Sequence, residues 1–134
     1  MSHDFATFMK TREAAARAYT AGDADPLKAI SARSGQATFF DPGGGFTEGA
    51  DRVLEVNIDG AKAFGAGGTS HFEIHDQGAS GDLAFWTGYQ RATVELKGKS
   101  QDMNIRVTEV FRRVDDAWKL VHRHASMAKE DMGS

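Results

Sequence analysis

Two side chains near the end of the chain have the types and spacing expected of a proton-transfer site. Glu109 lies in a row of alternating apolar residues, and His122 follows it after a turn signal at residues 115–116. Burial raises the pKa of a carboxylate unless a partner offsets it, and an ionisable pair in such a place is a candidate site. The same pair could instead only fix two strands, so both interpretations stay open.

A second carboxylate, Asp41, precedes a proline and three glycines. Carboxylates and imidazoles serve as general acids and bases when their pKa lies near the working pH. Asp41 could therefore abstract a proton from a small carbonyl compound, while Glu109 and His122 stabilise or reprotonate the enolate. Turn formation is the commoner role of an Asp at such a position. The catalytic candidates are Asp41, Glu109 and His122.

Two polar residues interrupt the apolar faces of predicted helices. Arg12 lies within the apolar arc of the first helix, and Asn57 lies within that of the third. Arg12 either extends its guanidinium out to water, which we favour, or points inward as a fixed cation for a carboxylate ligand. Asn57 is either satisfied by neighbouring backbone, which we also favour, or part of a site.

Four histidines form two pairs. His71 and His75 are four residues apart, and His122 and His124 are two apart, so each pair shares one face of its predicted strand. Together with nearby carboxylates they could bind a divalent metal. No motif fixes the geometry of one pair relative to the other, so we expect neither a metal nor another cofactor.

The helices that would position these residues are predicted in the first half of the chain. Apolar residues recur at three-to-four spacing over residues 4–20 and 50–64, and an Asp-Pro pair begins a short helix over residues 25–30. Residues 36–40 are typical of a short strand. Residues 41–45 must form a loop, because proline and three glycines suit neither a helix nor a strand.

The second half of the chain is predicted to be a strand meander. The apolar period changes from 3.6 to 2 after residue 68. Four strands are expected, at about residues 69–76, 83–96, 100–114 and 118–126. Helices followed by a meander make an α+β domain in which the helices cover one face of an antiparallel sheet. The length of 134 residues suits one such domain, residues 1–134.

The hairpin turns decide which side chains share a face of this sheet. A two-residue turn at residues 115–116 sets Glu109 opposite His122 on the apolar side. The preceding turn adds Trp86 and Gln90 to the same inner face. The sequence therefore predicts that Glu109 lies close to both His122 and Trp86.

Composition excludes several classes of protein. Hydrophobic residues make up 40% of the chain and charged residues 26%, with a net charge of −3, and no strong cluster of Lys and Arg is present. Nucleic acid is therefore not an expected partner. The chain has no cysteine, which excludes disulfides, thiolate zinc sites and a cysteine nucleophile. No basic-then-apolar leader or ~20-residue apolar run is present, so we expect a cytoplasmic protein without a membrane partner.

Residues 106–113 and 118–126 resemble the closing hairpin of the SnoaL-like branch of the nuclear transport factor 2-like superfamily. They are also similar to the association domain of calcium/calmodulin-dependent protein kinase II, and the resemblance spans nearly the whole chain. It implies a cystatin-like α+β barrel, in which a cone-shaped curved antiparallel sheet is wrapped by three helices from the N-terminal half. It further implies a pocket between sheet and helices, and a homodimer joined through the sheet.

Ketosteroid isomerase belongs to the same superfamily, and its resemblance bears on the catalytic candidates. It implies a general base at Asp41, which precedes Pro42, and a second acid near Glu109. The tyrosine that completes that enzyme's oxyanion hole aligns with Ala15 here, and Tyr19 lies one turn later. Steroid isomerisation is therefore not expected.

Two functions follow from these observations. We favour a domain that binds a small acidic or carbonyl-containing organic molecule without established chemistry. The alternative is an isomerase, cyclase or dehydratase that uses Asp41, Glu109 and His122 on a small carbonyl substrate. The expected ligand-binding residues are Arg12, Tyr19, Asn57, Trp86, Gln90, Phe111 and His124.

Overall fold

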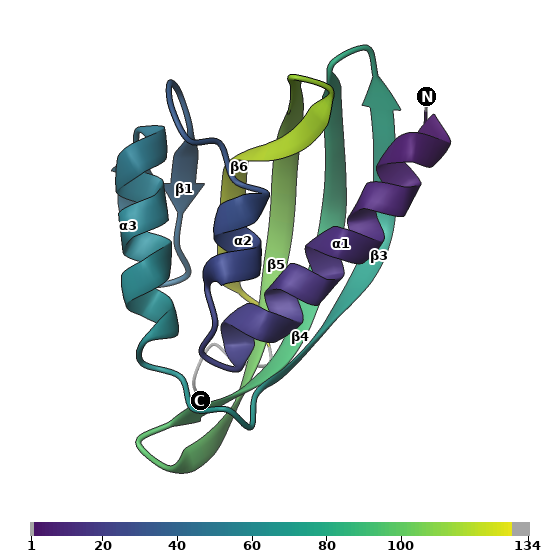
Figure 1. The fold of residues 1–134 in the computed structure, drawn as a ribbon. Coiled ribbons are helices and arrows are strands. Elements are labelled where there is room, and N and C mark those ends of the chain that lie inside the picture. The colour runs from purple at the N-terminus through teal and green to yellow at the C-terminus, as the bar shows by residue number, and fades with distance from the viewer. Residues whose placement is uncertain (1, 130–134) are drawn as a thin grey trace.

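The computed structural model describes residues 2–129 as a curled sheet with its helices on the concave face (Figure 1). The helices are α1 (Ser2–Thr20), α2 (Asp25–Ala29) and α3 (Ala50–Ala61). The strands are β1 (Thr38–Phe40), β2 (Phe46–Glu48), β3 (Thr69–Ser80), β4 (Leu83–Leu96), β5 (Lys99–Val114) and β6 (Ala117–Met127). The predicted α+β class is confirmed.

The sheet has six strands in the order β2-β1-β6-β5-β4-β3. It curls toward the helices without closing, so β2 and β3 form its two edges (Figure 1). The expectation of a purely antiparallel sheet was wrong in one place, because β1 pairs with β6 in parallel. Strand β2 was not predicted, because only three residues after the glycine loop pair with β1.

Two tight turns set the register of the long strands. Residues 97–98 and 115–116 all have positive φ values, between 51° and 79°, as expected of two-residue hairpin turns that match the twist of their strands. The first of these turns places Trp86 opposite Glu109, which confirms that prediction. Strand β3 extends to residue 80 rather than 76, because its last residues continue to pair with β4.

A bulge in β6 changes which of its residues face inward. Phe111 pairs with Leu120, but Val110 pairs with His122, so Val121 is an extra residue in the strand. From His122 onward, each residue of β6 therefore faces the side of the sheet opposite to the one it would face without the bulge. The predicted pairing of Glu109 with His122 was therefore wrong, and Glu109 instead lies opposite Arg123.

A second bulge lies in β3, where the register shifts at His75. Gly88 of β4 passes so close to the bulge that a Cβ there would overlap the carbonyl oxygen of Glu73. Only glycine allows this approach of two backbones. Bulges increase the local twist of a sheet, so the two together help β3 and β6 to curl around the helices.

The concave face has a filled half and a hollow half. In the filled half, beneath the first turns of α1, the rings of Phe5, Phe8 and Phe111 lie 5.3 to 6.0 Å apart, and Trp118 packs against Phe5 at 5.5 Å. In the hollow half, which faces α2, α3 and the end of α1, side chains leave a cavity. The candidate site lies there.

Candidate functional site

The cavity has a volume of about 310 Å³ and is bounded by all three helices, the β1 region and strands β4 to β6. This volume lies at the lower end of the range for small-molecule sites, roughly 300 to 1,000 Å³. Most of its lining is apolar. The larger polar side chains that line it are Arg12, Tyr19, Thr38, Asp41, Asn57, Gln90, His122 and Arg123.

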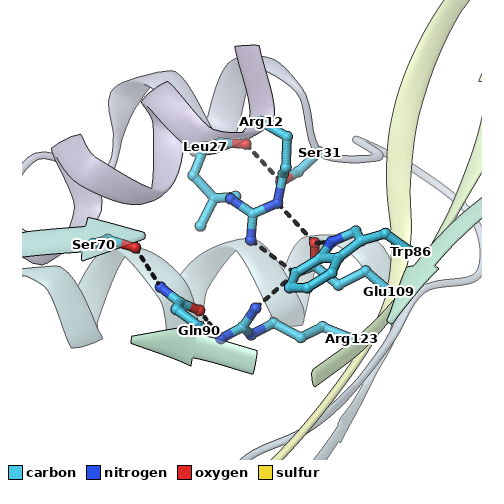
Figure 2. A network of polar contacts seen from close by, with 8 residues as sticks. All are labelled: Arg12, Leu27, Ser31, Ser70, Trp86, Gln90, Glu109 and Arg123. Atoms are coloured by element: carbon cyan, nitrogen blue, oxygen red, sulfur yellow. Dashed lines mark hydrogen bonds and ion pairs between the residues drawn. The ribbon is translucent and has the colours of Figure 1, made fainter. Parts of the chain in front are cut away.

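Glu109 is fully buried and does not line the cavity, and it accepts hydrogen bonds from three side chains (Figure 2). Arg12 donates from Nε to Oε1 at 2.8 Å and from Nη2 to Oε2 at 2.7 Å. Arg123 donates from Nη1 to Oε2 at 2.7 Å. Trp86 donates from Nε1 to Oε1 at 2.7 Å. The carboxylate is thus held between two guanidinium groups.

These contacts decide the ionisation of Glu109. Burial raises its pKa, but Arg12 and Arg123 outweigh that effect through their charges and hydrogen bonds and bring the pKa to about 2. Glu109 is therefore ionised at neutral pH and has no proton to give. The sequence predicted a raised pKa for Glu109 unless a partner offset the effect of burial. The structure supplies two such partners, Arg12 and Arg123.

Arg12 points inward, so the favoured expectation that its guanidinium reaches water was wrong. Its residue surface is only 3% exposed, because α1 turns this face toward Glu109. The guanidinium also lies 5.2 Å from the centre of the Phe72 ring. Among residues 2–129, its Nη1 nitrogen has no hydrogen-bond partner. Arg12 thus brings a buried cation with one unused nitrogen to the cavity wall.

Arg123 is held from both sides. Its Nη2 donates to Oε1 of Gln90 at 2.7 Å, and the Gln90 amide donates in turn to the Ser70 hydroxyl at 3.0 Å (Figure 2). Burial lowers the pKa of Arg123 and Glu109 opposes that effect. An arginine stays protonated under such conditions. Gln90, which was expected to bind ligand, lines the cavity and also orients this cation.

His122 lies beside β1 rather than beside Glu109. One of its ring nitrogens, Nδ1, is 2.7 Å from the Thr38 hydroxyl, and the ring lines both the cavity and a groove on the outer face of the sheet. Burial lowers the pKa of His122, His124 lowers it further, and Glu109 opposes both. The imidazole is therefore neutral at pH 7 and able to accept a proton.

Asp41 lies at the cavity wall and also forms a turn. Its Oδ1 accepts the backbone N–H groups of Gly43 at 2.9 Å and Gly45 at 3.0 Å. These bonds close the loop between β1 and β2. The turn-forming role is therefore realised, and the carboxylate lines the cavity as well.

The remaining expected ligand residues fall into two groups. Tyr19 and Asn57 line the cavity, whereas Trp86 and Phe111 are fully buried in the packed core and do not. His124 is exposed on the outer face, where it stacks on Phe40 at 5.1 Å between ring centres. Within residues 2–129, no three His, Asp or Glu side chains are placed to hold a metal ion.

Sequence reasoning missed Arg123 as a member of the site. The bulge at Val121 moves it to the inner face, and the alternation of residues in β6 gives no sign of that bulge. One physical signal was available, because a buried carboxylate is stable only with a cationic partner. Glu109 on an apolar row therefore called for an arginine, and both Arg12 and Arg123 provide one.

Comparison with known proteins agrees with this fold. The family model of the SnoaL-like domain matches residues 9–130. Among curated proteins, none matches the sequence significantly. Within residues 2–129, no helix is long and apolar enough to cross a membrane.

Solved structures share the fold over nearly the whole chain. A proposed dehydratase of the NTF2-like family from Streptomyces avermitilis is 23% identical, with a TM-score of 0.76, over 95% of this chain and 97% of that one. The CaMKII hub homology domain of Chlamydomonas reinhardtii is 19% identical, with a TM-score of 0.72, over 94% and 99%. A protein with a cystatin-like fold from Caulobacter vibrioides is 11% identical, with a TM-score of 0.72, over 95% and 89%. The expected homodimer stays a prediction.

Proposed function

We propose that this chain, which belongs to the SnoaL-like domain family, binds a small organic anion in its cavity. The observation that carries this proposal is the charge at the cavity wall, where Arg12 and Arg123 pair with one carboxylate, Glu109. Two cations and one anion leave a net positive charge in a buried place. A carboxylate or an enolate bound there would balance it.

The positions of the charged groups support an anion rather than a cation. Arg12 and Arg123 line the cavity, whereas Glu109 lies behind them and does not. A ligand therefore meets the guanidinium groups first. Glu109 acts as a positioning residue, since its hydrogen bonds fix both guanidinium planes before a ligand arrives.

Calorimetric titration with cyclohexanecarboxylate and its neutral amide tests this proposal. We expect the acid to bind at least tenfold more tightly than the amide, because only the acid is charged. Arg123→Lys keeps the charge but loses the planar fork, and should weaken binding of the acid. Arg91→Lys, on the outer face, is the matched control and should not. Equal binding of acid and amide, or no binding of either, would overturn the proposal.

Proton transfer is a second candidate, because Asp41 and the neutral His122 line the same cavity as the two arginines. In this mechanism His122 or Asp41 removes a proton next to a carbonyl group, and the arginines stabilise the enolate oxygen. Deuterium exchange of 4-oxocyclohexanecarboxylate in D₂O, followed by NMR, should then depend on the protein. Loss of that exchange in His122→Gln or Asp41→Asn would identify the base, and exchange no faster than in buffer would exclude the mechanism.

A further inference from the structure

The hydroxyl group of Tyr19 occupies a space that a glycine leaves open. Tyr19 extends from α1 toward the end of α3, and its ring meets Phe64, which follows α3, edge to face at 5.8 Å between centres. A Cβ atom added to Gly60 of α3 would lie well inside van der Waals contact with the Tyr19 oxygen. The hydroxyl therefore rests against the backbone of α3 at the cavity wall.

Gly60 is the second-last residue of α3, and it is not among the residues with positive φ. Its backbone conformation therefore does not require glycine. The lack of a side chain at this position leaves room for the Tyr19 hydroxyl.

Two polar groups lie at this wall, the Tyr19 hydroxyl and the Asn57 amide. Within residues 2–129, neither of them makes a hydrogen bond to another residue. Asn57 lies three residues before Gly60, on the same face of α3. Burial raises the pKa of Tyr19, and the charge of Arg123, which lines the same cavity, opposes that effect. A phenol and an amide without partners, beside a cation, can bind an oxygen of a ligand.

We propose that Tyr19 and Asn57 form a second polar subsite, which binds a carbonyl or hydroxyl oxygen of the ligand, and that Gly60 is the residue that positions Tyr19 for it. This inference rests on the proposed function, in which the acidic group of the ligand binds at Arg12 and Arg123. The ligand class is then an oxo- or hydroxycarboxylic acid with a small apolar frame. Gly60 touches no ligand atom in this scheme and acts through the hydroxyl.

The experiment compares cyclohexanecarboxylate with its 3-oxo and 4-oxo derivatives by calorimetric titration. With the unaltered protein, at least one oxo acid should bind roughly five- to tenfold more tightly than the parent acid, the gain of one good hydrogen bond. Tyr19→Phe should remove this advantage, so that this variant binds the oxo acid and the parent acid with about equal affinity. Gly60→Ala should do the same, because the added methyl displaces the hydroxyl.

The double variant Tyr19→Phe/Gly60→Ala separates positioning from a general structural effect. Without the hydroxyl there is nothing for the methyl to displace, so the double variant should bind both acids as Tyr19→Phe does. A further loss in the double variant would show that Gly60 acts on the cavity in another way. If Gly60→Ala alone does not fold, recovery of folding in the double variant supports the contact, and failure to recover overturns it.

The remaining outcomes distinguish this inference from the proposed function. If no acid binds, the proposed function fails and the second subsite fails with it. If the parent acid binds but neither oxo acid has an advantage, only the second subsite is overturned. The same holds if the advantage survives Tyr19→Phe. An advantage that survives Gly60→Ala but not Tyr19→Phe would overturn the role of Gly60 alone.

Discussion

The two halves of the concave face use the same sheet for opposite purposes. Beneath the first turns of α1, aromatic side chains from α1, β5 and β6 fill the space completely, with Phe5 and Phe111 no more than 1% exposed. Beneath α2 and α3, small residues such as Ala32, Ala37 and Ala92 line an open volume instead. The difference in side-chain size therefore decides where the molecule is solid and where it can admit a ligand.

Glu109 lies on the boundary between these halves. It accepts a hydrogen bond from Trp86, which belongs to the filled half, and from Arg12 and Arg123, which line the hollow half. A charged group at this place ties the packed core to the cavity wall. Stability and ligand binding are thus expected to depend on the same carboxylate, and the following variants test that expectation.

The largest effect is expected from Glu109→Gln. A neutral amide leaves the buried guanidinium of Arg12 and the partly buried guanidinium of Arg123 without a counter-charge, which should cost roughly 3 to 5 kcal/mol of unfolding free energy. Urea unfolding measures this loss. Glu73→Gln is the matched control, because Glu73 pairs with Arg91 on the outer face where both side chains are partly exposed, and it should cost less than about 1 kcal/mol. Similar losses for the two variants would contradict the role assigned to Glu109.

Acidification should produce the next largest effect. The pKa of Glu109 is about 2 in the folded protein, below its ordinary value of roughly 4.3 in an unfolded chain. Ionised Glu109 therefore adds its full share of the unfolding free energy at pH values above its pKa in the unfolded chain. This stabilisation, roughly 3 kcal/mol in total, is lost as the pH falls toward 2. Unfolding free energies measured from pH 5.5 to 2.5 should show this loss. If Glu109→Gln shows the same slope as the unaltered protein, another group is responsible.

The smallest effect on stability is expected from substituting two neighbouring alanines of α1. Ala15 is fully buried and does not line the cavity, whereas Ala16 does. Ala15→Leu should overpack the core and cost roughly 1 to 3 kcal/mol. Ala16→Leu should cost less, because its side chain can enter the open volume, but it should abolish binding of cyclohexanecarboxylate. Thermal unfolding and titration check the pair, and equal destabilisation would mean that the two halves are packed alike.

Most of the fold could be predicted from local patterns. The apolar periods located the three helices and four long strands, and the turns at residues 97–98 and 115–116 gave the correct register next to each turn. Turn chemistry acts over a few residues, so it is visible in the sequence. The parallel pairing of β1 with β6 was not predicted, because it joins residues such as Thr38 and His122 that are far apart in the chain.

The candidate site was predicted only in part, and one residue explains the main error. Val121 continues an ordinary strand pattern and needs no glycine or proline, so its extra position in β6 has no local signature. As a result His122, and not Arg123, was expected opposite Glu109. Arg12 was expected to reach water for a related reason, since its partner Glu109 lies 97 residues away in the chain.

The bulge at Val121 also decides which kind of charge stands next to Glu109. In a ladder without a bulge, Val121 would lie opposite Val110 and His122 opposite Glu109. With Val121 as the extra residue, His122 lies opposite Val110 and Arg123 opposite Glu109. The register of one strand therefore selects between a titratable base and a permanent cation, without any substitution among the residues that line the cavity.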